Sequence, residues 1–395
     1  MKNKAIKPVI SLILIYLAYM LLFIDRSVLN ISLAYIGHDF HLSPTALGSL
    51  ASAFFFSYSL MQIPGGWLVD KFGSRKLVAL TLGLWSLLTI ATGFSWSLLS
   101  LLIIRFSFGL AEGPFPAAAL KQISEEYPQK KRSQATSITL SSNYAGATLA
   151  PFLVAFAIGQ WSWRGAFYFL GILGLVLFLI YLCYEHPFKA LNKAASAPTR
   201  SKFAFSDLKK LDTKVISFLV IGLSLNVVTK GLDTWMPTYL LAKRHLDLKS
   251  IAWLVPLPTI AGGLAALISG FLLVHFFKNK ERLLLSLATL ATLAFMFGMY
   301  QATSLTGVIT FEVLTFFFKS LAFTSCFAYI AQTTNLKNYG ATVGIINFGG
   351  QLGGFLAPIM LGALVQATNG SFTFAFLSLV IWALVAFIAS LFIKK

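Results

Sequence analysis

Residues 9–30 read VISLILIYLAYMLLFIDRSVLN, an apolar run with one acidic and one basic side chain, Asp25 and Arg26, deep in its length. A helix that crosses a bilayer needs about 20 mostly apolar residues. Three lysines precede the run, as in a secretory signal peptide, but no small-residue cleavage site follows, and the run continues into the two charges. The stretch is therefore predicted to be a first membrane-spanning helix.

The rest of the chain repeats this pattern. Of 395 residues, 57% are hydrophobic and 11% are charged, whereas a soluble domain carries about 25% charged residues. Apolar stretches of spanning length cover residues 9–30, 45–70, 77–95, 98–120, 134–160, 164–183, 214–241, 251–275, 283–301, 304–330, 340–366 and 372–392. We predict an all-α membrane protein with twelve transmembrane helices.

The formal charge of +18 comes mainly from Lys and Arg residues in the loops on one side of the membrane, and not from a separate basic domain. With both termini placed inside, the inner loops and termini hold 22 of the 31 Lys and Arg residues. The outer loops hold Arg164, Lys243, Arg244 and Lys249. This asymmetry follows the positive-inside rule and predicts cytoplasmic N- and C-termini. It argues against nucleic-acid binding, because no soluble basic domain is present to perform it.

One long polar stretch, residues 184–213, divides the twelve spans six and six. We therefore predict an N-terminal six-helix bundle over 1–184, a basic cytoplasmic linker over 185–213 and a C-terminal six-helix bundle over 214–395. Two pseudo-symmetric halves of this kind are typical of transporters built from parallel repeats, whose site lies near the middle of the membrane. All other connections are short, so no catalytic domain outside the membrane is expected.

Charged pairs inside the spans support the internal symmetry. Arg105 and Glu112 lie seven residues apart in the fourth span, and Glu312 and Lys319 lie seven apart in the tenth with the signs exchanged. Seven residues make about two helical turns, so each pair shares a helix face, roughly 10 Å apart along the axis.

The first and seventh spans also correspond. Asp25 and Arg26 in the first match Lys230 and Asp233 in the seventh, although Asp233 is also compatible with a place near the outer surface.

Each charge near the centre of a span costs about 2.5 to 3.5 kcal/mol on insertion scales, so these side chains must face the bundle interior. A buried carboxyl group that gains and loses a cationic neighbour during a conformational cycle takes up and releases a proton. Asp25 and Glu112 are our candidates for that role.

The cations are candidates for binding an anion. Arg26 or Arg105 suits this role because an arginine keeps its charge and offers a planar fork that matches a carboxylate. Lys230 and Lys319 would add attraction from the other half. The alternative is structural: Arg105 with Glu112, Lys319 with Glu312, and Lys230 with Asp233 would then be ion pairs that lock helices together.

The sequence gives no sign of a metal centre or a nucleophile. Its histidines have no ligand spacing and mostly lie in loops or at span ends: His38, His41, His186, His245 and His275. Both cysteines, Cys183 and Cys326, fall inside predicted spans. A membrane enzyme or a receptor is the disfavoured alternative.

Residues 66–76 read GWLVDKFGSRK between the second and third spans. This segment resembles the loop signature of the major facilitator superfamily nearly completely. In that superfamily the loop is a latch on the cytoplasmic side. The resemblance gives this role to Gly66, Asp70, Gly73 and Arg75. The equivalent segment after the eighth span, residues 270–282, lacks the acidic residue at the position that matches Asp70, where Val274 and His275 lie.

Within that superfamily the chain resembles the anion:cation symporter family, which includes sialin, the vesicular glutamate transporters and bacterial sugar-acid carriers. The matching segments are IDRSVLN over 24–30, YSLMQIPGG over 58–66, RFSFGLAEGP over 105–114, and NFGGQ over 347–351 with Ala357 and Pro358. The resemblance covers essentially the whole chain.

The resemblance implies roles for individual residues. Asp25 and Glu112 look like the family's proton-coupling carboxylates, and Arg26 and Arg105 like its substrate and coupling arginines. Polar side chains at cavity-lining positions would bind substrate, or else serve in helix packing: Tyr58, Gln62, Asn143, Asn347 and Gln351. Lys230 and Lys319 match no family position and favour a substrate with more than one negative charge.

These features together predict a monomer in a bacterial cytoplasmic membrane that imports a small organic anion with protons, by alternating access. Sugar acids and hydroxycarboxylates fit such a site. No cofactor is expected beyond the proton as coupling ion. The alternative transport function is an exporter or exchanger of organic anions, including siderophore-like carboxylates.

Overall fold

The computed structural model describes residues 2–186, 213–278, 280–333 and 336–393, and in these ranges the regular structure is entirely helical. The first half forms α1 (Lys2–Phe40), α2 (Pro44–Phe72), α3 (Ser74–Gly93), α4 (Leu98–Glu112), α5 (Phe115–Glu126), α6 (Gln129–Gln160) and α7 (Trp163–Glu185). The second half forms α8 (Thr213–Ala242), α9 (Leu248–Leu254), α10 (Pro256–His275), α11 (Glu281–Gln301), α12 (Leu305–Thr333), α13 (Leu336–Ala367) and α14 (Thr373–Leu391). Most of the predicted linker lies outside the described residues.

The membrane-spanning pattern is confirmed. Eleven helical segments of the described chain are long and apolar enough to cross a membrane, and α2 makes twelve if its two parts count as one span. Those two parts, Pro44–Gln62 and Pro64–Phe72, meet at an angle of 56°. Pro64 lies at the bend, where its ring and missing N–H interrupt the helical hydrogen bonds.

Two predicted spans are each built from two helices. The fourth is α4 followed by α5, and the chain breaks between them at Gly113 and Pro114. The eighth is α9 followed by α10, where Val255 separates the two helices and Pro256 begins the second. Proline is favourable at a helix start because its fixed φ and absent N–H cost nothing there.

Two predicted loops were wrong in their bounds. The first span was predicted to end at residue 30 and the second to begin at residue 45, but α1 continues to Phe40 and α2 begins at Pro44. The signature segment 66–76 is also helical except at Gly73, which separates α2 from α3. Gly73 has φ 84° and ψ 150°, a region that only glycine adopts readily.

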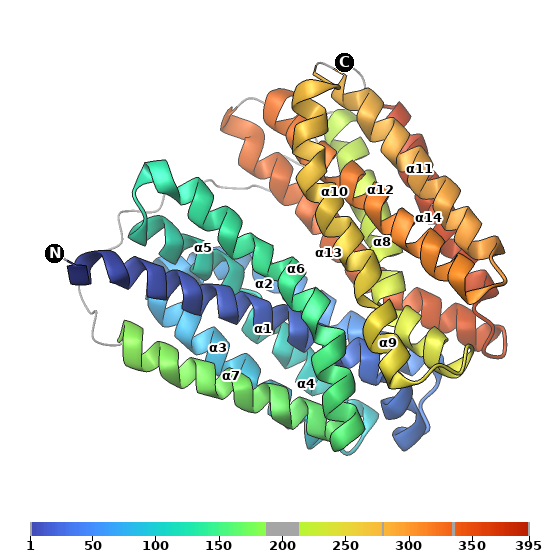
Figure 1. Ribbon diagram of the computed structural model, residues 1–395, viewed down its shortest axis with the longest axis horizontal. Helices are drawn as coiled ribbons and strands as arrows, with labels where there is room; N and C mark the ends of the chain where they lie inside the picture. The colour runs from blue at the N-terminus through green and yellow to red at the C-terminus, as the bar shows by residue number, and fades with distance from the viewer. Residues whose placement is uncertain (1, 187–212, 279, 334–335, 394–395) are drawn as a thin grey trace. The chain divides into compact units, whose positions relative to one another are not determined.

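By its internal contacts the chain divides into two compact units. The N-terminal unit comprises Met1–Leu42 and Ala53–Arg200, and the C-terminal unit comprises Ser43–Ser52 and Ser201–Lys395. In the N-terminal unit α1 packs against α6 and α3 against α7 (Figure 1). In the C-terminal unit α8 packs against α13 and α11 against α14. Corresponding spans therefore pair in the same way in both units.

Close helix contacts at small residues position the charged spans. A Cβ on Gly109 of α4 would lie 2.5 Å from the Phe54 carbonyl oxygen and 2.9 Å from the Tyr58 nitrogen of α2. The same pairing recurs in the second unit, where a Cβ on Gly262 of α10 would lie 2.8 Å from Ser320 Oγ of α12. Small residues at such contacts let two helix backbones approach within a membrane.

A serine of α2 inserts into α13 within the C-terminal unit. Ser52 Oγ donates to the Phe355 carbonyl at 2.6 Å and accepts from the Ile359 N–H at 3.2 Å. These are the two groups that an uninterrupted α-helix would join to each other. The Ser52 hydroxyl thus bonds to both backbone groups of one turn of α13, next to Pro358.

Candidate functional site

An ion pair between α1 and α4 forms the centre of the candidate site in the N-terminal unit. Arg26 Nε donates to Glu112 Oε1 at 2.6 Å, and Arg26 Nη2 contacts the same oxygen. The Glu112 side chain is fully buried, whereas that of Arg26 is 19% exposed. The guanidinium is therefore the accessible partner of this pair.

Aromatic rings surround the Arg26 guanidinium. Its carbon lies 5.1 Å from the centroid of Phe23, 5.2 Å from that of Phe54 and 4.6 Å from that of Tyr58. Rings at these distances attract a cation through their negative faces and exclude water from it. This arrangement orients Arg26 and strengthens its attraction for an anion.

Asp25, the neighbour of Arg26, points into a different environment. It is 1% exposed, and neither carboxyl oxygen has a hydrogen-bond partner among the described residues. Arg105 and Glu112 lie within electrostatic range of it. Two buried oxygens without donors are costly to keep ionised, and a bound proton removes that charge.

Arg105 also retains unused hydrogen-bonding capacity. It is 2% exposed, and its Nε and Nη2 have no acceptor in the described part of the chain. Its guanidinium carbon lies 5.2 Å from the Phe108 centroid and 5.0 Å from that of Phe167. The expected alternative of a direct Arg105–Glu112 pair was wrong, because Glu112 bonds to Arg26 from another helix.

The surroundings of Asp25 include residues that the sequence did not suggest. Trp85 and Thr89 of α3 lie beside its carboxyl group, and both are buried. The Trp85 indole N–H has no acceptor within the described residues. Trp85 and Thr89 lie in the apolar run 77–95, and nothing in the local sequence distinguishes them from the other residues of that span.

The remaining N-terminal candidates lie close to this centre or on the same helices. Tyr58 is buried and contacts Arg26, whereas Gln62, one turn further along α2, is exposed. Asn143 lies on α6 with a buried, unpaired Oδ1 among the described residues. It precedes Gly146 by three residues, and a Cβ on Gly146 would lie 3.0 Å from Phe23 Cβ, so Asn143 shares the face of α6 that packs on α1.

The C-terminal unit has its own charged cluster on α8 and α12. Lys230 Nζ donates to Asp233 Oδ2 at 2.8 Å, one helical turn away. Asp233 is also within electrostatic range of Glu312 and Lys319. Glu312 is 4% exposed. In the described part of the chain, Glu312 and Lys319 do not form the expected ion pair with each other.

Within the described residues, no hydrogen bond or ion pair joins the polar candidates of α13 to this cluster. Asn347 is exposed and Gln351 is half-buried. Lys319 Nζ lies 5.1 Å from the Phe316 centroid.

The signature segment makes ion pairs inside the N-terminal unit. Asp70 Oδ1 accepts from Lys121 Nζ of α5 at 2.5 Å. Arg75 donates through Nε to Glu185 Oε2 of α7 at 2.9 Å and through Nη2 to Glu126 Oε1 of α5 at 2.9 Å. The three partner residues were missed from the sequence, where an acidic or basic residue at the end of a span looks like an ordinary loop charge.

No group of three or more His, Cys, Asp or Glu side chains in the described ranges has the geometry of a metal site. Cys183 is exposed and Cys326 is buried. In this part of the chain, the titratable side chains that lie close to one another are the carboxyl and guanidinium groups described above.

Comparison with known proteins identifies the family of the chain. The family model of the Major Facilitator Superfamily matches residues 15–318. The chain therefore belongs to this superfamily, and it is a multi-pass membrane transporter and not an enzyme.

Similar proteins include three bacterial transporters. A hexuronate transporter of Bacillus subtilis (strain 168) is 27% identical, over 94% of this chain and 90% of that protein. A probable galactarate/D-glucarate transporter of Escherichia coli (strain K12) is also 27% identical, over 97% and 93%. A probable sulfoacetate transporter of Cupriavidus necator is 28% identical, over 96% and 92%.

Solved structures share the fold at lower identity. A bacterial homologue of the human lysosomal transporter Spinster has a TM-score of 0.81 at 19% identity, covering 97% of this chain and 95% of that one. The nucleoside transporter NupG has a TM-score of 0.76 at 15% identity, covering 98% and 100%.

Proposed function

We propose that this protein imports a small organic anion, of the sugar-acid or hydroxycarboxylate class, together with protons by alternating access. The Arg26–Glu112 pair is the observation that carries the proposal. The hexuronate, galactarate and sulfoacetate transporters to which the chain is similar support the substrate class. The charge asymmetry of the loops supports a bacterial cytoplasmic membrane with both termini inside.

Exchange of partners at Arg26 would couple anion and proton. A substrate carboxylate that binds the partly exposed guanidinium competes with Glu112 for the same N–H donors. Glu112 is buried, so once displaced it loses its cation in a low-dielectric site and takes up a proton. When the anion leaves, Arg26 returns to Glu112 and the proton is released.

Asp25 and Arg105 would hold the second half of the coupling machinery. Both are buried and both have unused hydrogen-bonding capacity among the described residues. With Asp25 protonated, the two arginines and Glu112 carry one net positive charge, and this charge is unchanged after binding, because the proton that Glu112 takes up balances the bound carboxylate. The site then favours an anion and a proton together over either one alone.

Hydroxyl and amide groups would give the site its preference for hydroxylated substrates. In the N-terminal unit these are Tyr58, Gln62 and Asn143. In the C-terminal unit Asn347 and Gln351 have the same chemistry, and Lys230 and Lys319 would attract a second negative charge.

Transport in proteoliposomes tests the proposal. Wild-type protein should accumulate labelled D-glucuronate against its gradient when the outside is more acidic than the inside. Glu112→Gln should lose this accumulation and keep exchange of labelled for unlabelled glucuronate. Glu125→Gln is the matched control, because Glu125 is exposed at the end of α5 and bonds only to Ser74 among the described residues.

Undiminished accumulation by Glu112→Gln would refute the assignment of Glu112. Accumulation only under the reversed proton gradient would show an exporter in place of an importer.

A further inference from the structure

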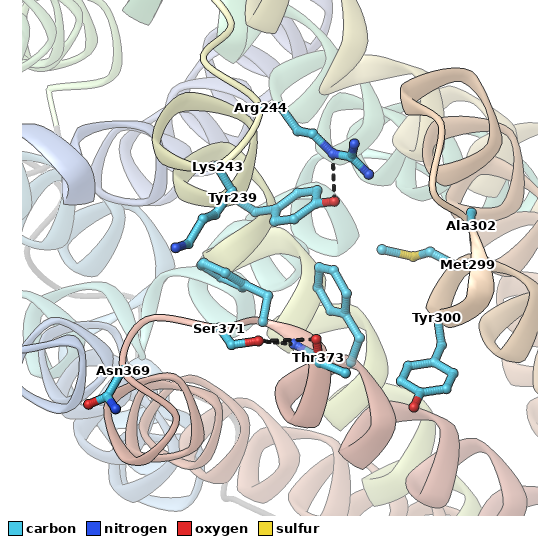
Figure 2. Close-up of a pocket in the computed structure, with 11 residues that line it drawn as sticks. Tyr239, Lys243, Arg244, Met299, Tyr300, Ala302, Asn369, Ser371 and Thr373 are labelled. Carbon is cyan, nitrogen blue, oxygen red and sulfur yellow. Dashed lines mark hydrogen bonds between the residues drawn. The ribbon is translucent and has the colours of Figure 1, made fainter.

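A cavity of about 390 Å³ lies within the C-terminal unit (Figure 2). It is formed by the end of α8, the connection from α11 to α12 and the turn between α13 and α14. These three segments lie at the end of the unit remote from the C-terminus of α14. Under the orientation proposed above, that end faces the outside. A cavity of this size is within the range of small-molecule sites.

Two adjacent cations line the cavity without a carboxylate partner. Lys243 and Arg244 form no ion pair with any acidic side chain of the described chain. The nearby Asp247 accepts from the Ser250 N–H at 2.9 Å, and hydrogen bonds from Ser250 lower the pKa of the Asp247 carboxyl below its ordinary value. The outer loops of membrane proteins are poor in Lys and Arg, so this pair is an exception that an anionic ligand would explain.

The structure holds Arg244 in place and leaves part of its fork free. Its Nε donates to Tyr239 Oη at 2.7 Å, as Figure 2 shows, and its Nη1 donates to the Thr303 carbonyl at 2.8 Å. An arginine has five N–H donors, so the remaining ones are available to a ligand. A guanidinium oriented in advance loses less entropy when it binds a carboxylate.

The rest of the lining is preformed and suited to hydroxyl groups. Tyr239 packs edge to face against Phe372 and Phe376, with centroids 5.3 and 5.1 Å apart, and all three residues are at most 9% exposed. Ser371 Oγ donates to Thr373 Oγ1 at 3.0 Å, and Asn369 adds an amide further along the same turn, apart from these two hydroxyl groups (Figure 2). Aromatic walls with a few hydroxyl and amide groups are the lining expected for a polar small molecule.

We propose that this cavity is a peripheral binding site for small hydroxylated carboxylates. Lys243 and Arg244 hold the carboxylate, and the hydroxyl and amide groups of the α13–α14 turn bind the substrate hydroxyls. The site captures the anion from the outside and raises its local concentration at this end of the C-terminal unit. This role rests on the proposed function, whereas binding at the cavity does not.

The test measures binding and uptake in the full-length protein. D-Glucuronate is titrated into purified protein in neutral detergent, and the number of bound molecules is compared among variants. Wild type should bind at two sites, the double variant Lys243→Gln/Arg244→Gln at one, and Arg26→Gln at one. Lys249→Gln, an exposed lysine that does not line the cavity, should behave as wild type.

Uptake gives an independent readout. The double variant should raise the KM for glucuronate by about tenfold, the factor that one charge-assisted hydrogen bond supplies, and leave the maximal rate unchanged. Unchanged binding and KM in the double variant would overturn the proposal. So would loss of one wild-type site when phosphatidylglycerol is added, because the cavity would then hold a lipid headgroup.

The two proposals fail separately. If Arg26→Gln transports normally while the double variant loses one binding site, the proposed function is wrong and the peripheral site stands. If Arg26→Gln abolishes uptake and the double variant binds as wild type, the peripheral site is wrong and the proposed function stands.

Discussion

Replacement of Arg75 should destabilise the N-terminal unit, because this one side chain joins α3 to α5 and α7. It donates to Glu126 and to Glu185 at 2.9 Å each, and these two carboxyl side chains are 6% and 0% exposed. A hydrogen bond to a charged group contributes about 1.5 to 3 kcal/mol. Because the Arg75 side chain is 32% exposed, each bond is taken at the lower end of this range. Two such bonds then contribute about 3 kcal/mol to the free energy of unfolding.

Arg75→Gln should therefore lower the free energy of unfolding by about 3 kcal/mol, a change of roughly a hundredfold in the unfolding equilibrium. The measurement is reversible denaturant unfolding in detergent, followed by fluorescence. Arg75→Lys keeps the charge and one bond, so it should lose about half as much.

The double variant Arg75→Gln/Glu185→Gln should recover part of the loss, since removing both partners leaves fewer unpaired buried charges. Wild-type stability in Arg75→Gln, or no recovery in the double variant, would refute the proposed network.

Three further substitutions test two helix contacts and one turn. Gly109→Ala should cost about 1 to 3 kcal/mol by pushing α4 away from α2, whereas Gly159→Ala, with open space around its Cβ, should be neutral in the same thermal-unfolding assay. Ser52→Ala should cost about 1 to 3 kcal/mol because it removes the bridge in α13, and Ser49→Ala, which loses one bond within its own helix, should cost less. Gly73→Ala should cost about 1 to 3 kcal/mol through backbone strain alone; equal stability of wild type and variant would show that the turn adjusts.

The number and order of the membrane-spanning helices were predictable, because each helix is marked by its own run of apolar residues. Apolar runs of spanning length and the positive-inside asymmetry identify helices and their orientation without reference to neighbours. The bounds failed where helices continue beyond the apolar run. The last turn of α1, with His38 and Asp39, is helical although polar, because the backbone hydrogen bonds of a helix do not require apolar side chains.

The sequence predicted which charged residues belong to the candidate site, but not which of them form ion pairs with each other. Charges in the middle of spans must face the interior, which singles out Arg26, Arg105 and Glu112. Which arginine pairs with Glu112 depends on tertiary packing, in which α4 approaches α2 closely at Gly109 and Arg26 of α1 lies over the Phe54 ring of α2. Spacing within one helix favoured Arg105, and tertiary packing selected Arg26.

The central claim is that an anion displaces Glu112 from Arg26 and that Glu112 then takes up a proton. Proton uptake on binding measures this directly, in purified protein in weakly buffered detergent solution at neutral pH. Addition of D-glucuronate should draw about one proton per anion bound at the Arg26 site from the solution, and Glu112→Gln should bind the anion with no such uptake. Binding of glucuronate by the wild type without a change in solution pH would contradict the account.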